Sequence, residues 1–151
     1  MGRKRENLAR ARSLLEAHGV RVLRRSSLYR TQPVAFERQP WFINQVLGVE
    51  SGKEPGDLLR LVKRLEKEMK RIPGRRFGPR RIDIDILLAG RKVISEKALR
   101  IPHPRLAGRR FVLTALAEVA PRAVHPLLKK SARRLLSETS DRAVVMRIEG
   151  G

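Results

Sequence analysis

The clearest pattern along the chain is a run of apolar residues at helical spacing within residues 57–70. These residues would form one continuous stripe, which is typical of a helix packed against a core. The same spacing predicts an earlier helix over residues 6–18, with Gly19 as its C-terminal stop. Two further helices are expected over residues 111–119 and 131–138.

The remaining patterned segments indicate β-strands, because apolar residues recur there at spacings of two or in short continuous runs. The expected strands are 20–30, 42–50, 82–88 and 143–148, with 92–95 as a short hairpin partner of 82–88, and the expected loops are 33–40, 71–80 and 99–110. This order of elements predicts a single α+β domain over residues 1–151. Its architecture would be an α/β sandwich in which helices cover a mainly antiparallel sheet.

The length of 151 residues fits one domain, and the composition excludes several classes of protein. The chain has no cysteine, so it can form neither a disulfide nor a thiolate metal site. Its longest apolar runs, such as residues 86–89, are far shorter than a membrane span, and no apolar signal segment follows the basic start. We therefore expect a cytoplasmic protein with no membrane partner.

A strong positive charge is the main feature of the composition: 35 Lys and Arg stand against 15 Asp and Glu, a formal net charge of +20. Such a charge favours phosphate-bearing partners, which are nucleic acids, nucleotides or an anionic membrane surface. Arg contributes 26 of the basic residues and binds phosphate in a bidentate manner, although a codon bias toward Arg explains this equally well. The charge therefore indicates a class of partner and no reaction.

Asp83 and Asp85 lie two residues apart in the expected strand 82–88, so both would point to one face while isoleucines point to the other. Two such carboxylates repel each other unless a cation lies between them or basic groups pair with them, and hard oxygen ligands suit Mg²⁺. A solvated strand face is the commoner explanation of this pattern alone. The basic residues 70–80 directly upstream favour the metal, because phosphoryl transfer needs metal-binding acids beside phosphate-binding cations.

Two further segments offer groups that could contact a ligand. His103 lies between Pro102 and Pro104, so its imidazole could donate to a phosphate or act as an acid, or it could be a structural loop residue. Asn44 follows two aromatic residues, and an amide between aromatic rings suits a flat polar heterocycle. For the second segment, a core aromatic cluster is the simpler interpretation from these residues alone.

Together these segments resemble one family, the 6-hydroxymethyl-7,8-dihydropterin pyrophosphokinases of folate biosynthesis. The resemblance covers about residues 2–140 and keeps the order and spacing of the family's motifs. Its most specific part is the pattern Gly-Pro-Arg-x-x-Asp-x-Asp at residues 78–85, joined to Pro-His-Pro-Arg at residues 102–105. The other matching segments are Ser27–Thr31 and Gln39–Asn44.

The resemblance implies a ferredoxin-like fold and transfer of pyrophosphate from ATP, the co-substrate, to the hydroxymethyl group of the pterin, with release of AMP. It implies that Asp83 and Asp85 hold two Mg²⁺ ions. The residues implied for ATP are Arg71, Arg80, His103 and Arg109 at the phosphates, with Glu66 and Ile86 at the adenosine. The residues implied for the pterin are Asn44 at its edge, Phe42 and Phe111 at its ring, and Thr31, Pro33 and Val34 closing the pocket.

The chain departs from the family's pattern at three places. Phe77 replaces the usual Trp, and Lys70 replaces the usual Gly before Arg71. Members of the family begin with an apolar strand and a Gly-Ser-Asn turn, whereas this chain begins at the first helix, so the N-terminal strand is expected to be missing. Residues 143–148 would either fill that position, from the same chain or a second copy, or form an ordinary edge strand.

Two other interpretations remain open on the sequence alone. The charge would suit a non-enzymatic RNA-binding α+β domain, although the expected strands lack the paired aromatic residues of an RNA-recognition motif. A truncated family member without activity is the second alternative. The main expectation is a monomeric pyrophosphokinase whose partners are small molecules and not nucleic acids.

Overall fold

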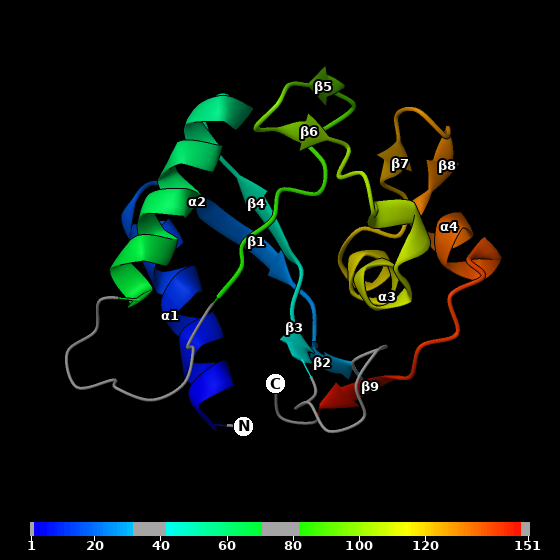
Figure 1. Cartoon of the computed structure of the whole chain (residues 1–151), viewed down its shortest axis with the longest axis horizontal. Coiled ribbons are helices and arrows are strands. Elements are labelled where there is room, and N and C mark those ends of the chain that lie inside the picture. The colour runs from blue at the N-terminus through cyan, green and yellow to red at the C-terminus, as the bar shows by residue number, and fades with distance from the viewer. Residues whose placement is uncertain (1, 32–41, 71–81, 149–151) are drawn as a thin grey trace. The chain divides into compact units, whose positions relative to one another are not determined.

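The computed structural model describes residues 2–31, 42–70 and 82–148 (Figure 1). The described residues form α-helices and short antiparallel strands, so the expected α+β class is confirmed. The helices are α1 (Gly2–Ala17), α2 (Pro55–Lys70), α3 (Arg110–Val119) and α4 (Ala132–Glu138), with a 3₁₀ helix η1 (Leu106–Gly108). The strands are β1 (Arg21–Arg25), β2 (Leu28–Thr31), β3 (Phe42–Asn44), β4 (Leu47–Glu50), β5 (Ile94–Ser95), β6 (Arg100–Ile101), β7 (Val124–His125), β8 (Lys130–Ser131) and β9 (Val145–Ile148). None of the helices in the described part of the chain is long and apolar enough to cross a membrane.

The chain folds into two compact units, whose boundaries lie within β1, within β4 and after Ile86. The first unit comprises Met1–Leu23 and Val49–Ile86, and the second comprises Arg24–Gly48 and Leu87–Gly151. The described strands form several small sheets: β1 pairs with β4, β2 lies between β3 and β9, β5 pairs with β6, and β7 pairs with β8. The chain therefore passes from one unit to the other three times.

In the first unit, α1 packs against α2 through their apolar sides. The buried residues of this core are Ala11, Met69 and Ile82, with Leu8, Leu14 and Ile84 packed against them. The apolar stripe expected in residues 57–70 is confirmed, because it supplies the buried side of α2. α1 starts at Gly2, earlier than expected, and stops before Gly19, whose φ of +85° lets Val20 N–H donate to Leu15 O at 2.9 Å.

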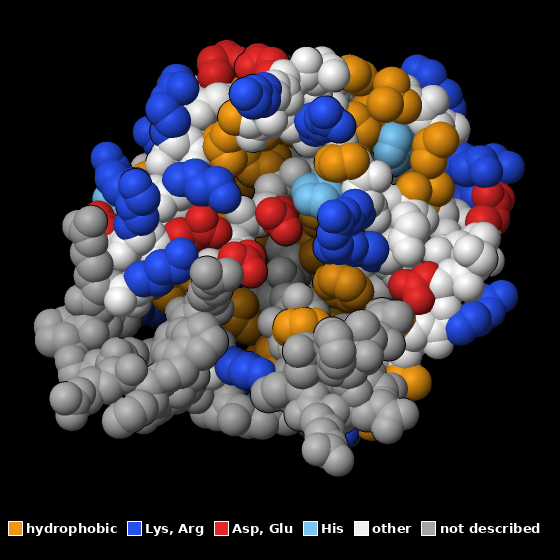
Figure 2. Space-filling view, viewed as in Figure 1, with side chains coloured by type: hydrophobic (Ala, Val, Ile, Leu, Met, Phe, Trp, Pro, Cys, Tyr) orange, Lys and Arg blue, Asp and Glu red, His pale blue; other side chains and the backbone are white. Residues whose placement is uncertain are grey.

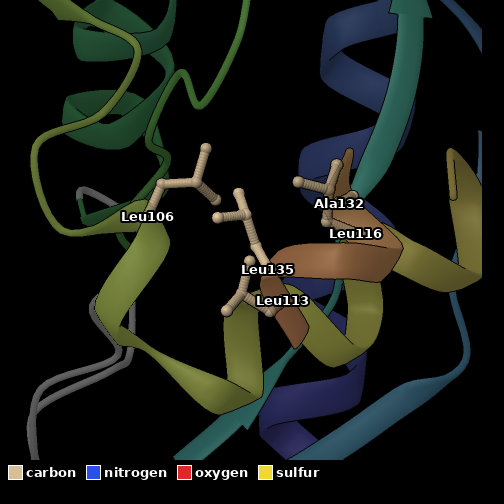
Figure 3. Close-up of a cluster of buried hydrophobic side chains, with 5 residues drawn as sticks. All are labelled: Leu106, Leu113, Leu116, Ala132 and Leu135. Carbon is tan, nitrogen blue, oxygen red and sulfur yellow. The ribbon is translucent and has the colours of Figure 1, made fainter. Parts of the chain in front are cut away.

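The second unit contains the antiparallel sheet β3-β2-β9, with α3 packed against β2 and α4 packed against α3. β9 lies at one edge of this sheet among the described strands, and its position agrees with both alternatives for residues 143–148. Side chains of η1, α3 and α4 meet in a buried cluster, drawn in Figure 3, whose members are Leu106, Leu113, Leu116, Ala132 and Leu135. This cluster stabilises α3, which carries part of the candidate site. The expected helices over residues 111–119 and 131–138 are therefore confirmed to within one residue.

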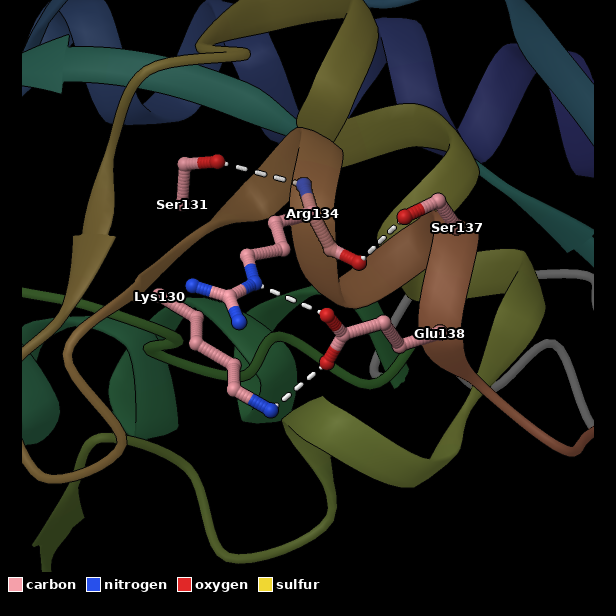
Figure 4. A network of polar contacts seen from close by, with 5 residues as sticks. All are labelled: Lys130, Ser131, Arg134, Ser137 and Glu138. Atoms are coloured by element: carbon pink, nitrogen blue, oxygen red, sulfur yellow. Dashed lines mark hydrogen bonds and ion pairs between the residues drawn. The ribbon is translucent and has the colours of Figure 1, made fainter.

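Polar contacts hold both ends of α4 (Figure 4). At its N-terminus, the Ser131 hydroxyl accepts a hydrogen bond from Arg134 N–H at 3.1 Å. At its C-terminus, the Glu138 carboxylate binds Lys130 Nζ at 2.6 Å and Arg134 Nε at 2.8 Å. Because Lys130 and Ser131 form β8, these bonds tie the helix to the hairpin before it.

Residues 82–88 pair with no strand in the described part of the chain, so the strand expected there is wrong. The expected alternation is nevertheless confirmed at residues 82–85, because Ile82 and Ile84 pack into the core while Asp83 and Asp85 are exposed. Ile84 N–H donates to the Glu66 carboxylate, and Leu87 O accepts from His103 N–H. In a sheet, these backbone groups would bond to an adjacent strand. Hydrogen bonds to a side chain and to a loop therefore hold this segment.

The hairpin expected between residues 92–95 and 82–88 is also wrong. Ile94–Ser95 pairs instead with Arg100–Ile101, inside the segment expected to be a loop. Ile101 lies directly opposite Ile94 and is 1% exposed, so burial of this apolar pair favours the observed pairing. The short hairpin β7-β8 is a further element that the apolar pattern did not predict.

Each of the two long strands expected at residues 20–30 and 42–50 is divided into two. At the division, Ser26 N–H donates to Val46 O at 2.8 Å, and the Ser26 hydroxyl accepts from Val46 N–H at 3.0 Å. Gln45 Nε2 also donates to Ser26 O at 2.8 Å. Side-chain hydrogen bonds therefore replace part of the ladder at this point, which the apolar pattern could not show.

Candidate active site

Asp83 and Asp85, in the first unit, lie on the solvent side of an extended segment. Neither Asp83 nor Asp85 makes a hydrogen bond or an ion pair with any residue that the structure describes. Free carboxylates at this spacing can give oxygen ligands to Mg²⁺, which usually binds one or two carboxylates and keeps waters or substrate phosphates as its other ligands. The described residues contain no group of three metal-binding side chains, so a cation here would need such outside ligands. The donor set fits Mg²⁺ on these terms.

Glu66 on α2 fixes the backbone that carries both aspartates. It is 9% exposed, and its Oε2 accepts a hydrogen bond from Ile84 N–H at 2.8 Å. Its Oε1 lies 3.5 Å from Lys63 Nζ. Because Ile84 stands between Asp83 and Asp85, this bond holds the chain at the point from which both acids project. Glu66 was expected to border the adenosine. The structure shows that it also binds the backbone between Asp83 and Asp85.

The register of the three-stranded sheet brings three of the expected pterin residues to one face of the second unit. Thr31 on β2 lies opposite Phe42 on β3, and Tyr29 lies opposite Asn44. Directly opposed residues share a face, as do alternate residues of a strand, so Thr31, Phe42 and Asn44 share one. Asn44 Nδ2 donates to Thr31 Oγ1 at 3.5 Å, and Phe42 is 53% exposed. An oriented amide beside an exposed ring suits a flat polar heterocycle.

Glu118 holds α3 against this face of the sheet. Its carboxylate accepts hydrogen bonds from the N–H and hydroxyl of Ser27 and from the hydroxyl of Tyr29, each at 2.8 Å. Partial burial raises the pKa of Glu118, but the bonds from Ser27 and Tyr29 lower that pKa further, so the net direction is downward. Burial and the neighbouring carboxylate both raise the pKa of Tyr29. The carboxylate therefore stays charged, and the Tyr29 hydroxyl stays a donor.

Phe111 lies near the start of α3, seven residues before Glu118. Seven residues make nearly two helical turns, so the two side chains lie on the same side of α3. At its other end α3 bonds to Arg24 of β1 through Val119 O and to Tyr29 of β2 through Glu118. Phe111 therefore lies on the side of α3 that faces β2.

His103 and Arg109 offer hydrogen-bond donors in the second unit. His103 Nδ1 accepts from Arg105 N–H at 3.1 Å, so the proton of the neutral imidazole lies on Nε2. The backbone of the same residue is fixed by its N–H, which donates to Leu87 O at 2.9 Å. The guanidinium carbon of Arg109 lies 5.7 Å from the centre of the Phe111 ring, within the range of a cation–π contact. The Nε2–H group and the guanidinium both suit phosphate oxygens.

Lys and Arg side chains are spread over the face drawn in Figure 2, with Asp and Glu scattered among them. Together with the net charge of +20, this distribution attracts anionic ligands. The few acidic groups that bond to no other described residue, Asp83 and Asp85 among them, therefore stand out as candidates for binding a cation.

Comparison with known proteins identifies the family of this chain. The model of the family described as 7,8-dihydro-6-hydroxymethylpterin-pyrophosphokinase (HPPK) matches residues 1–121. The chain belongs to this family. A Bacillus subtilis protein named 2-amino-4-hydroxy-6-hydroxymethyldihydropteridine pyrophosphokinase is 40% identical over 120 residues, which cover 79% of this chain and 72% of the relative. An Aquifex aeolicus protein of the same name is 38% identical over 115 residues, which cover 76% and 72%.

Other relatives in the HPPK comparison are much longer than this chain. A Pneumocystis carinii protein named Folic acid synthesis protein fol1 is 42% identical over 109 residues, which cover 72% of this chain but 15% of the relative. The matched segment spans 15–25% of the length of this and other fungal and plant relatives. The similarity to those proteins therefore concerns one segment of each.

The match to the HPPK family includes every residue expected in the site, whereas α4 and β9 lie beyond residue 121. The described site residues of the first unit are Glu66, Asp83, Asp85 and Ile86. Those of the second unit are Thr31, Phe42, Asn44, His103, Arg109 and Phe111. Four further expected residues lie outside the described part of the chain, namely Pro33, Val34, Arg71 and Arg80.

Glu118 was not among the residues expected from the sequence. It is the only acid in the apolar stretch 111–120, and this isolated charge is the signal that could have identified it. Asp141, which has no such signal, accepts a hydrogen bond from the backbone N–H of Arg110 across 31 positions of sequence. Nothing in the local pattern around Asp141 points to that contact.

Proposed function

We propose that this chain transfers the pyrophosphoryl group of ATP to 6-hydroxymethyl-7,8-dihydropterin, giving the pterin diphosphate and AMP. The HPPK match over residues 1–121 carries this proposal, and it is supported by the exposed carboxylates of Asp83 and Asp85, which bond to no other residue that the structure describes. The proposal includes a ferredoxin-like arrangement of the whole chain as one domain. It also includes a monomer that acts on small molecules in the cytoplasm.

The proposed reaction forms one oxygen–phosphorus bond and breaks another. The hydroxymethyl oxygen attacks the β-phosphorus of ATP, and the bond from that phosphorus to the oxygen bridging the α-phosphate breaks. AMP leaves with the bridging oxygen, and the hydroxyl proton passes to water. Because the charge is spread over phosphate oxygens, catalysis depends mainly on positioning and on charge neutralisation.

Asp83 and Asp85 are proposed to hold Mg²⁺, with two ions in the complete site. The chemistry that Mg²⁺ supplies when bound is neutralisation of the phosphate charge. The bond from Ile84 N–H to Glu66 supports this role, because it keeps the backbone of both aspartates in place without using their carboxylate oxygens. Glu66, with Ile86, is also proposed to border the adenosine.

The phosphates of ATP are proposed to bind His103 and Arg109, together with Arg71 and Arg80. The Nε2–H group of His103 can donate to a phosphate oxygen because Nδ1 is already used by Arg105 N–H. The N–H groups of the Arg109 guanidinium can bind phosphate in a bidentate manner while the guanidinium stays over the Phe111 ring. These contacts would orient the β-phosphorus toward the incoming hydroxyl.

The pterin is proposed to lie on the sheet face of the second unit. Asn44 would read the polar edge of the ring, since an amide can both donate and accept. Phe42 and Phe111 would contact the ring faces, and Thr31, with Pro33 and Val34, would close the pocket. The contact between Asn44 and Thr31 supports this arrangement because it orients the amide before the ligand arrives.

AMP formation is the measurement that tests the proposed function. The protein is incubated with ATP, Mg²⁺ and 6-hydroxymethyl-7,8-dihydropterin, and nucleotides are separated by chromatography. AMP and the pterin diphosphate should form in equal amounts, and omission of any component should stop both. A 6-methyl pterin, which lacks the attacking hydroxyl, controls for simple ATP hydrolysis. Absence of AMP from the complete mixture would overturn the proposal.

A further inference from the structure

We propose that Val145 borders the pterin pocket and that Asp141, four residues earlier in the chain, positions the start of α3. The inference rests on the proposed function and extends it to residues beyond the matched range 1–121. Asp141 acts through the backbone of α3, so it is a positioning residue. Val145 is a pocket residue whose size limits the ligand.

Asp141 joins the C-terminal segment to α3 through both carboxylate oxygens. Oδ2 accepts a hydrogen bond from Arg110 N–H at 2.9 Å, and Oδ1 accepts one from Ala143 N–H at 2.9 Å. Arg109, the residue before α3, makes no side-chain capping bond. Asp141 instead binds the N–H of the first helical residue, which is one of the N–H groups that have no partner within the helix. One side chain therefore holds both the start of the helix and the path of the chain toward β9.

The charge of Asp141 supports this contact. The hydrogen bond from Arg110 N–H lowers the pKa of Asp141 most, and the bond from Ala143 N–H lowers it further. A negative charge is also favourable beside the N-terminus of a helix. The carboxylate is therefore fully ionised at neutral pH, and both of its oxygens act as acceptors.

The helix start that Asp141 holds carries two residues of the proposed site. Arg110 lies between Arg109, proposed for the ATP phosphates, and Phe111, proposed for the pterin ring. A shift of the backbone at Arg110 would move both neighbours together. Small displacements of binding groups weaken binding strongly, so the hydrogen bond to Arg110 N–H can affect affinity without touching a ligand.

β9 places Val145 on the proposed pterin face. Thr31 lies directly opposite Val145 of β9 on one side and opposite Phe42 of β3 on the other. These three residues therefore form one row across the same face of the sheet. Val145 is half-buried, whereas Val144, just before the strand, is 48% exposed and outside the paired register. The two adjacent valines thus differ in their relation to the pocket.

The first experiment compares Val145→Leu with Val144→Leu in steady-state kinetics. Both substitutions add one methylene to a valine near the end of the chain. Val145→Leu should raise the KM for the pterin about 3–10-fold, because a larger side chain narrows the pocket, and should leave the KM for ATP unchanged. Val144→Leu should leave both KM values within twofold of the wild type. Equal pterin KM values for the two variants would overturn the role of Val145.

The second experiment compares Asp141→Ala and Asp141→Asn with Glu138→Gln. Glu138 is an exposed acid of the same region whose partners belong to α4 and β8, so its variant controls for the loss of one charge. Asp141→Ala should raise the KM for both substrates about tenfold or more, and Asp141→Asn should raise them less because it keeps one acceptor oxygen. Glu138→Gln should leave both KM values unchanged.

Kinetic constants separate positioning from a purely structural role. Loss of folded protein lowers the apparent kcat and leaves KM unchanged for the molecules that remain folded, so a fall in kcat alone would overturn the role of Asp141. Wild-type turnover is measured first in the same assay. Absence of wild-type turnover would overturn the proposed function, and this inference with it. Turnover by the wild type with unchanged KM values in all variants would overturn this inference alone.

Discussion

The two units of the protein hold their proposed functional side chains in opposite ways. In the first unit, Asp83 and Asp85 are exposed and bond to no other described residue, while their backbone is anchored by Glu66. In the second unit, the side chains of the proposed pterin face bond to one another, as Asn44 does to Thr31.

This difference follows from what each set of residues has to do. A carboxylate that binds a cation needs its oxygen lone pairs free, so its position has to come from the backbone. A face that recognises a heterocycle needs its donors and acceptors oriented before the ligand arrives, so hydrogen bonds among side chains are an advantage. The carboxylates of the first unit should therefore affect turnover more than stability, and the hydrogen bonds of the second unit should affect both.

The largest expected effect is the loss of turnover in Asp83→Ala and Asp85→Ala. Each should lower AMP formation about 10³-fold or more, because loss of a metal ligand removes several kcal/mol of transition-state stabilisation. The melting temperature should stay the same or rise, since a repulsive carboxylate is removed. Asp57→Asn, which breaks an exposed pair with Arg60, is the matched control and should retain activity. Normal AMP formation by either alanine variant would refute the metal assignment.

Glu66→Ala should affect both stability and activity, because the anchor of the acidic segment is lost. Ile84 N–H would lose its charged acceptor, which should cost about 1–3 kcal/mol in the free energy of unfolding. Glu66→Gln keeps an acceptor oxygen and should recover most of this loss. Chemical denaturation measures the stability, and AMP formation measures the activity. Equal destabilisation by both variants would argue against the anchoring bond.

Glu118→Ala should destabilise the second unit by about 1–2 kcal/mol, since it removes three hydrogen bonds to a carboxylate that is still partly in contact with water. Tyr29→Phe removes one of these bonds and should cost about 1 kcal/mol or less. The double variant should lose less unfolding free energy than the sum of the losses in the two single variants, because both substitutions remove the same hydrogen bond. Strict additivity in denaturation experiments would contradict the contact between Glu118 and Tyr29.

The smallest expected effect is a pH dependence that comes from His125. This residue is 7% exposed, its Nδ1 accepts from the N–H groups of Leu127 and Leu128, and burial lowers its pKa below the ordinary 6.5. The unfolded chain therefore binds a proton more readily, so the stabilising contribution is present above pH 6.5 and is lost as the pH falls toward the folded-state pKa.

One titrating group can change the free energy of unfolding by at most about 1.4 kcal/mol per pH unit. His125→Asn, which keeps a side-chain acceptor but does not titrate in this range, should show a smaller fall in unfolding free energy between pH 7 and pH 5. Thermal melts of both proteins across this range give the comparison. Identical pH profiles would rule out His125 as a source of the dependence.

The parts of the fold that the sequence predicted depend on local periodicity. The apolar stripe of α2 and the helices α3 and α4 follow from spacing within one turn or a few turns, and the structure confirms them. The alternation around Asp83 is equally local, because successive residues of an extended chain point in opposite directions. The expected strand at residues 82–88 was wrong because a strand also needs a partner, which no local pattern specifies.

The candidate site likewise has features that local sequence predicts and features that depend on distant contacts. The motif around Asp83 and Asp85 and the one around His103 indicate the family through residue types and short spacings alone. The contacts that hold the site residues are distant in sequence, such as Ser27 with Glu118 and Arg110 with Asp141, and no spacing rule predicts them. The charge of Glu118 within an apolar stretch was a visible signal, whereas Asp141 lies in a polar segment and gave none.

The sequence by itself determined the family, the helical segments and the identity of the proposed metal-binding and phosphate-binding residues. These properties depend on which side chains are present and on apolar residues that recur every two to four positions. Only the tertiary structure decided that Ile94 pairs with Ile101, that Glu66 anchors Ile84, and that β9 brings Val145 beside Thr31. Each of these contacts satisfies a backbone group or buries an apolar side chain by using a segment far along the chain. Many segments could supply such a partner, and only packing selects one.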